Sequence, residues 1–193
     1  MYNIRGGQAN LFVVVMLVGL VLVLGVSLAG YFSTYVASVS SESSLKNAIQ
    51  YEIANTVVYK EFDSGTAVWL GLIRIDGSST TYYMLVINTS SCVWQRISEE
   101  NIVSNLLSNG LEGVRAGRSV DLNSVYILDP DGNHIPIKTY YRGSSPITIY
   151  EIFVEAGGKP KLIGPIPHGG GCVEVVFLTL ANNNYYEVGK VYV

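Results

Sequence analysis

Between Arg5 and Glu42 the sequence contains no charged residue. Over the whole 193-residue chain, Asp, Glu, Lys and Arg make up only 14% of the residues, against about a quarter in an average globular domain. The net charge is −3, and no cluster of Lys or Arg occurs outside the N-terminus. Because nucleic-acid-binding proteins normally carry a basic cluster, no nucleic-acid partner is expected.

The motifs that mark enzymes and metal sites are also missing. His134 and His168 are the only histidines, and neither has a carboxylate at the spacing of zinc ligands. Residues 129–133 (Asp-Pro-Asp-Gly-Asn) resemble the start of a calcium loop, but the required Gly is misplaced and Tyr140 stands where the bidentate Glu is needed. A hairpin turn is the better interpretation. Since no GxSxG motif and no phosphate-binding loop occur, the sequence predicts no enzyme, no cofactor and no metal.

What the chain does contain is a long apolar segment near its start. Leu11 to Gly30 is a run of twenty uncharged, mainly apolar residues. At about 1.5 Å per residue, such a helix covers the roughly 30 Å hydrocarbon core of a bilayer. Arg5 precedes the run, and positive charges stay on the cytoplasmic side, so the rest of the chain is expected outside the cell.

The helix is expected to continue well beyond the apolar run. No Pro or Gly occurs between Gly30 and Gly65, and Leu45, Ile49, Ile53 and Val57 recur every four residues. A Ser-rich stretch at 38–44 favours a local bend. We therefore predict a leader at 1–7, a long helix at 8–62 that is first apolar and then amphipathic, and an outer domain at 63–193.

The outer domain is predicted to be rich in antiparallel strands. Two β-prone runs, 66–75 and 80–87, flank Asp76-Gly77, which is typical of a hairpin. Further strands are expected at 92–96, 124–128, 134–141, 147–155, 172–180 and 185–193, with a short helix from Ser98 to Asn109 and a loop at 157–171. The predicted fold class is α+β: a long N-terminal apolar helix followed by an antiparallel β-sandwich-like domain of the immunoglobulin-like or Greek-key kind, with one short helix.

Two covalent features are expected in this domain. Cys92 and Cys172 are the only cysteines, and in an extracellular domain they predict a disulfide that closes a loop of about 80 residues. Two free buried thiols are the alternative. Asn88-Thr89-Ser90 is the one N-glycosylation sequon, and it is expected in a turn, with Asn88 as the candidate acceptor.

The order of these segments resembles that of type IV pilins, in which a short basic leader ends in Gly and precedes an apolar helix that carries an outer domain. The stretch IRGGQANLF is similar to a class III signal peptide, which a prepilin peptidase cuts before the apolar segment. The cut would follow Gly6 or Gly7. The cleavage region comprises Arg5, Gly6, Gly7 and Gln8. The fifth mature residue would then be Leu11 or Phe12 rather than the Glu of bacterial pilins, which is similar to archaeal pilins and archaellins.

This resemblance implies a structural protein. The subunit would wait in the membrane, be processed by the prepilin peptidase, and enter an extracellular homopolymer, driven by the assembly ATPase and platform protein, for surface adhesion. Alternatives are a subunit of an archaellum-type swimming filament and a single-span anchor for an extracellular binding domain. The helix positions expected to pack in the filament core are Leu11, Val15, Gly19, Leu22, Gly25, Leu28, Phe32, Leu45, Ile49, Ile53 and Val57.

Overall fold

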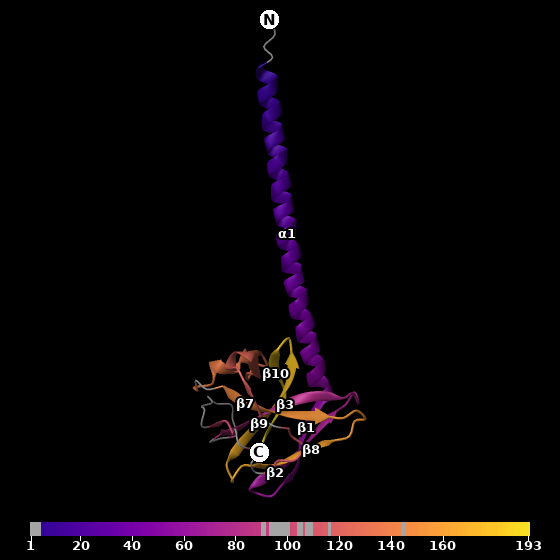
Figure 1. Cartoon of the computed structure of the whole chain (residues 1–193), viewed down its shortest axis with the longest axis vertical. Helices are drawn as coiled ribbons and strands as arrows, with labels where there is room; N and C mark the ends of the chain where they lie inside the picture. Colours follow the sequence, from indigo (N-terminus) through magenta and orange to yellow (C-terminus); the bar gives the residue numbers. More distant parts are fainter. Residues whose placement is uncertain are drawn as a thin grey trace. The chain divides into compact units, whose positions relative to one another are not determined.

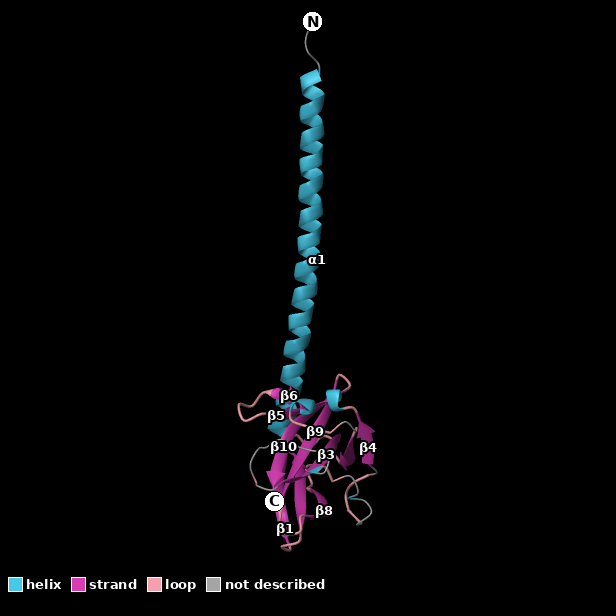
Figure 2. Cartoon of the chain, turned by 90° about the vertical axis from the view of Figure 1, so that its left-hand side faces the viewer, coloured by secondary structure: helices cyan, strands magenta, loops and turns pink. Residues whose placement is uncertain are grey.

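The computed structural model describes residues 5–89, 92, 101–103, 106, 110–115, 117–143 and 146–193, with the backbone alone described at 5–10. The chain forms two compact units, residues 1–46 and 47–193. The first is helical, and the second contains the strands (Figures 1 and 2). The predicted short helix from Ser98 and the predicted strand at 92–96 lie almost wholly outside the described residues.

Helix α1 runs from Arg5 to Asn55. It stays helical through the Ser-rich stretch at 38–44, where a bend was predicted. Serine weakens a helix by competing for backbone hydrogen bonds, but here the Ser38 hydroxyl donates to the Tyr35 carbonyl inside the helix, at 2.8 Å. The stretch therefore forms part of one uninterrupted helix.

The predicted helix end at Phe62 is wrong. The helix ends at Asn55, and β1 (Thr56–Asp63) follows it directly and pairs antiparallel with β2 (Ala67–Arg74). Residues 56–59 are Thr-Val-Val-Tyr, and these β-branched and aromatic side chains fit a pleated sheet better than a helix. Val57 consequently lies on a strand, and the outer unit begins at Asn47, inside the last turns of α1, rather than at residue 63.

In the described part of the outer unit, ten strands form two sheets. The three-stranded sheet has the order β1-β2-β8, and the seven-stranded sheet has the order β4-β7-β3-β9-β10-β5-β6. The remaining strands are β3 (Thr80–Thr89), β4 (Gly117–Val120), β5 (Val125–Leu128), β6 (His134–Pro136), β7 (Ile147–Val154), β8 (Lys161–Pro167), β9 (Cys172–Ala181) and β10 (Asn184–Tyr192). Pairing is antiparallel except between β10 and β5, which run parallel, so the larger sheet is mixed rather than purely antiparallel.

The α+β class is confirmed, but the predicted hairpin at Asp76-Gly77 is wrong. β2 pairs with β1 and β8, whereas β3 pairs with β7 and β9, so the Asp76-Gly77 turn connects two different sheets. Both edges of β2 are already occupied, which leaves no place for β3 beside it. A turn dipeptide fixes the reversal of the chain, but not the strand that its neighbours pair with.

Two other boundaries differ from the sequence prediction. The segment 157–171 contains β8, although it was predicted as a loop because of its Gly and Pro residues. Ile163 and Ile166 of β8 are fully buried, and this burial outweighs the poor strand propensity of Pro165 and Pro167. The predicted strand at 134–141 is divided into β6 and a 3₁₀ turn, η4 (Ile137–Thr139).

Apolar side chains pack on both faces of the seven-stranded sheet. One core joins the two sheets and contains Leu70 of β2, Met84 of β3 and Phe177 of β9, all fully buried. The other contains Leu85 of β3, together with Ile137 of η4. The outer unit thus closes its own hydrophobic core.

Candidate functional site

The apolar part of α1 presents hydrophobic side chains in every direction. Leu11 is 67% exposed, and the large apolar side chains that follow it stay exposed as far as Val39, at 48%. Within the described chain, this is the one helix that is long and apolar enough to cross a membrane. A helix without a polar face needs apolar neighbours all round, either lipid or protein.

Two hydroxyl groups in this part of the helix donate to backbone carbonyls of the helix itself. Ser27 Oγ donates to the Val23 carbonyl at 2.7 Å, and Thr34 Oγ1 donates to the Gly30 carbonyl at 2.9 Å. No hydroxyl proton of these two residues therefore needs a partner from a surrounding apolar phase. The local structure is compatible with a membrane and with a helical bundle.

The predicted packing positions fall into two groups. Those on the apolar part are open to contact from outside. Their large side chains are exposed, and a Cβ placed on a glycine of this part would meet no atom within 4 Å other than the adjoining backbone of the helix. This group contains Leu11, Val15, Gly19, Leu22, Gly25, Leu28 and Phe32. Two amphipathic positions serve the outer unit instead: Ile49 is 5% exposed, and Ile53 packs against the core. Leu45 is half-buried within the first unit, and Val57 is 40% exposed on β1.

Arg74 joins the last turns of α1 to the end of β2. Its side chain is buried, with two guanidinium nitrogens donating to the two carboxylate oxygens of Glu52 and Nη1 also to the Tyr82 hydroxyl, at 3.2 Å. Arg74 Nε donates to Asp76 Oδ1 at 2.8 Å. The Asn55 carbonyl, at the helix end, accepts from the Ile75 amide at 2.9 Å.

The charges in this cluster stabilise one another. Hydrogen bonds from Arg74 and the Ser78 amide hold the pKa of Asp76 well below its usual range. Burial opposes the charge on Arg74, but the hydrogen bonds with Glu52, Asp76 and Tyr82 outweigh it and raise the pKa of the guanidinium. Sequence reasoning missed this cluster, although one signal was present: Arg74 is the only charge in the apolar run 66–75, and a lone charge in a buried strand requires a partner.

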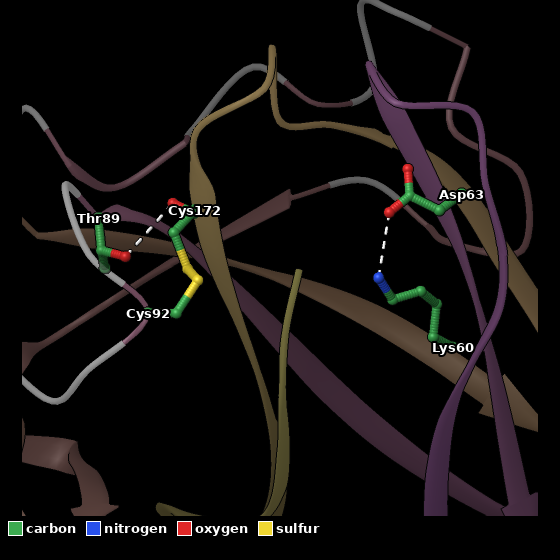
Figure 3. The surroundings of a disulfide bond; sticks show 5 residues. All are labelled: Lys60, Asp63, Thr89, Cys92 and Cys172. Atoms are coloured by element: carbon green, nitrogen blue, oxygen red, sulfur yellow. Dashed lines mark hydrogen bonds and ion pairs between the residues drawn. A yellow bond between two sulfur atoms is a disulfide. The ribbon is translucent and has the colours of Figure 1, made fainter.

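The predicted disulfide is confirmed. Cys92 and Cys172 are bonded, with 5.4 Å between their Cα atoms and 80 residues between them in sequence. Figure 3 shows the bond beside Thr89, whose hydroxyl donates to the Cys172 carbonyl at 3.3 Å. The end of β3 is thus joined to the start of β9 by a backbone ladder, a side-chain hydrogen bond and a covalent bond.

Asn88 lies on β3 opposite Val173, not in a turn as predicted. Its side chain is exposed, whereas Thr89 is buried and Ser90 lies outside the described residues. Strand pairing extends to Thr89 because Val86 and Ile87 continue the buried pattern up to the sequon. Glycosylation of Asn88 stays a prediction.

Residues 129–133 form the turn between β5 and β6, as predicted. Asp129 Oδ1 accepts from the backbone amides of Asp131 and Asn133, at 3.0 and 2.8 Å. The carboxylate is therefore occupied by the turn itself. In the part of the chain that the structure describes, no group of three or more His, Cys, Asp or Glu residues could hold a metal ion.

His168 has a carboxylate neighbour that the sequence did not indicate. Its Nε2 lies 3.2 Å from Asp63 Oδ1. Lys60 Nζ donates to the other carboxylate oxygen, Asp63 Oδ2, at 3.1 Å, as Figure 3 shows. Hydrogen bonds from the Gly65 amide, Lys60 and His168 lower the pKa of Asp63 to about 2. This group closes the turn between β1 and β2.

The predicted cleavage region, Arg5, Gly6, Gly7 and Gln8, belongs to the first turns of α1, and its side chains lie outside the described residues. Cleavage there stays a prediction. Comparison of the chain with protein-family models, with curated proteins and with solved structures finds no match.

Proposed function

We propose that this chain is the structural subunit of an extracellular filament of the type IV pilus class, which polymerises through the apolar part of α1. One observation carries the proposal: apolar side chains are exposed on all sides of a helix that extends further than a bilayer requires. The exposed stretch from Leu11 to Val39 is about 43 Å long at 1.5 Å per residue, against a hydrocarbon core of roughly 30 Å.

The excess length favours a filament over a plain anchor. Nine residues, 31–39, remain beyond a membrane span of twenty residues that starts at Leu11. Five of them are large, apolar or aromatic, and exposed: Tyr31, Phe32, Tyr35, Val36 and Val39. Water would disfavour these side chains by roughly 25 cal/mol per Å² of apolar surface. In a bundle of identical helices these side chains would be covered. Around the apolar run, neighbouring helices would take the place of lipid.

The energy of assembly follows from the two environments. Leaving lipid for a helical bundle gains little hydrophobic free energy, because lipid is as apolar as the bundle. Close packing must supply the preference, and Gly19 and Gly25 provide places for it, since the space above each is open. An assembly ATPase with its platform protein would supply the work of extraction, after a prepilin peptidase removes the leader at Gly6/Gly7 or Gly7/Gln8.

The role that we propose for the filament is surface adhesion, with the closed outer unit exposed on the filament surface. The other role that fits the same helix is a swimming filament of the archaellum type. The single-span anchor is the remaining alternative, and it predicts a monomer that stays in the membrane.

The test is electron microscopy of material sheared from cells that express the chain, with mass spectrometry of the subunit. We expect helical filaments whose subunit begins at Gly7 or Gln8. Val36→Asp should abolish filaments while the subunit still inserts in the membrane, because Val36 lies beyond the bilayer core. Ser41→Asp is the matched control, since it adds the same charge at a polar exposed position. An intact Met1 in a monomeric membrane fraction would refute the proposal.

A further inference from the structure

The three-stranded sheet has one covered face and one open face. The covered face contributes Val68, Leu70, Leu72, Ile163 and Ile166 to the core. The open face carries apolar and aromatic side chains, of which Phe62 is 57% and Leu162 46% exposed. We call it the aromatic face and define it by Val57, Tyr59, Phe62, Trp69, Ile73 and Leu162. Contiguous exposed apolar surfaces of this kind often mark interaction sites.

A β-bulge places Phe62 on this face. Lys60 pairs with Leu70 and Phe62 with Trp69, so Glu61 is the extra residue of β1. In a regular ladder, Phe62 would stand opposite Val68, whose side chain is fully buried in the core. The bulge turns the ring outward to Trp69, with the two ring centroids 5.5 Å apart and the ring planes at 51°.

Two glycines allow the neighbouring rings to lie on the sheet. A Cβ on Gly71 would stand 2.3 Å from Cζ of Tyr59, and a Cβ on Gly164 would stand 2.7 Å from Cδ1 of Trp69. The phenol ring therefore covers the backbone of Gly71, and the indole ring covers that of Gly164. Each ring is supported from beneath by the sheet, and both side chains are half-buried.

The charged groups beside the rings favour some classes of binding partner for the aromatic face over others. The Glu61 carboxylate is close enough to Tyr59 that, after burial, its charge contributes to raising the pKa of the phenol, and Asp63 is held by Lys60 and His168. A two-fold contact of this face with its own copy would bring like charges at Glu61 together, and insertion into lipid would strip water from that carboxylate. A neutral sugar has neither cost, because its C–H faces stack on aromatic rings and its hydroxyl groups donate to a carboxylate.

We propose that the aromatic face binds a polysaccharide, with pyranose rings stacked on Phe62 and Trp69 and a sugar hydroxyl donating to Glu61. The site belongs to the outer unit alone. It does not rest on filament assembly, because an unassembled chain carries the same face.

The test uses the full-length chain as a monomer, in a detergent without a sugar headgroup. Binding is measured by depletion from solution on three insoluble probes: cellulose, chitin and mannan. We expect binding to at least one of them, and Phe62→Ala and Trp69→Ala should each weaken it by about tenfold, the order of loss for one stacked ring. Phe153→Ala is the matched control, since it removes a part-exposed Phe from the seven-stranded sheet.

Two further variants separate stacking from general apolar contact and from misfolding. Phe62→Tyr keeps a flat ring and should bind as the unchanged chain does, whereas Phe62→Leu keeps the apolar volume and should lose about as much affinity as Phe62→Ala. Failure of the unchanged chain to bind any of the three probes would overturn the proposal, as would equal losses in Phe153→Ala. Normal sugar binding by Phe62→Ala and Trp69→Ala with weakened self-association would overturn it in favour of a second copy as the partner.

Discussion

Arg74 Nη2 donates to Glu52 Oε1 at 3.0 Å, and with this contact the end of a strand is fixed to the last turns of a helix 22 residues earlier in the chain. Arg74 is 5% exposed as a residue, so removing Glu52 would leave its charge poorly solvated. The carbonyls at the end of α1 are satisfied separately: the Asn55 side chain donates to the Tyr51 carbonyl at 2.9 Å, and the Thr56 hydroxyl donates to the Glu52 carbonyl at 2.6 Å.

Arg74→Met should lower the free energy of unfolding by about 3 kcal/mol, the range found when one member of a buried ion pair is removed. Urea unfolding of the chain in detergent, followed by the circular dichroism of its strands, measures the change. Lys46→Met breaks the exposed Lys46–Glu42 pair and should change stability by at most about 0.5 kcal/mol. The double variant Glu52→Met with Arg74→Met should recover much of the loss, and equal stability of Arg74→Met and the unchanged chain would contradict the prediction.

Glu187 should make the outer unit less stable as pH rises. Its side chain is 1% exposed, and burial raises its pKa although Lys190 and the Leu128 amide favour the charged form and Glu174 opposes it. The folded state then keeps a proton that the unfolded state has lost, so the free energy of unfolding falls as pH increases from about 4.5 through the folded pKa.

Glu187→Gln should remove this part of the pH dependence, since its amide oxygen can still accept from Leu128 and cannot ionise. Urea titrations from pH 4 to pH 8 measure it, with Glu155→Gln at an exposed position as the control. An unchanged slope in Glu187→Gln would refute the assignment.

Replacing both cysteines with Ser should cost the outer unit about 4 kcal/mol, as expected for a loop of 80 residues that the disulfide closes. The comparison is made by urea unfolding of oxidised chain, reduced chain and the double Ser variant. Reduced and double-Ser chains should agree with each other. Equal stability in all three forms would show that the disulfide does not constrain the unfolded chain.

Gly113→Ala should destabilise the fold more than Gly65→Ala. Both residues have left-handed backbones, with φ of +81° and +84°, so each substitution carries a strain of about 1 kcal/mol. A Cβ on Gly113 would in addition stand 2.2 Å from the Leu162 carbonyl oxygen, whereas no atom lies within 4 Å at Gly65. Thermal unfolding of the two variants measures the difference, and equal midpoints would contradict it.

The sequence predicts the parts of this fold that depend on composition and short-range pattern. The apolar helix follows from the absence of charge, and strands at 80–89, 147–154 and 172–181 follow from runs of buried β-branched and aromatic residues. The disulfide was predicted from two cysteines in a domain that is expected outside the cell, and it is confirmed. Partners of strands depend on contacts far apart in sequence, so the place of β3 in the larger sheet was not predictable from Asp76-Gly77.

The same limit applies to the surfaces. Arg74 could have been recognised as a buried charge, but its partners at Glu52 and Asp76 come from the helix and the turn. Alternation along β1 assigns Phe62 to the core side, and only the bulge at Glu61 reverses that assignment. Local irregularities of this kind carry no clear signal in a single sequence.

The direct succession of Asn55 and Thr56 has a mechanical consequence. No loop separates the last residue of α1 from the first residue of β1, so a force applied along the helix is transmitted directly to the sheet. The backbone hydrogen bonds between β1 and β2 then share this force. The Arg74–Glu52 ion pair adds a second connection between the end of the helix and β2. The outer unit is thereby built to resist tension at the point where the helix enters it.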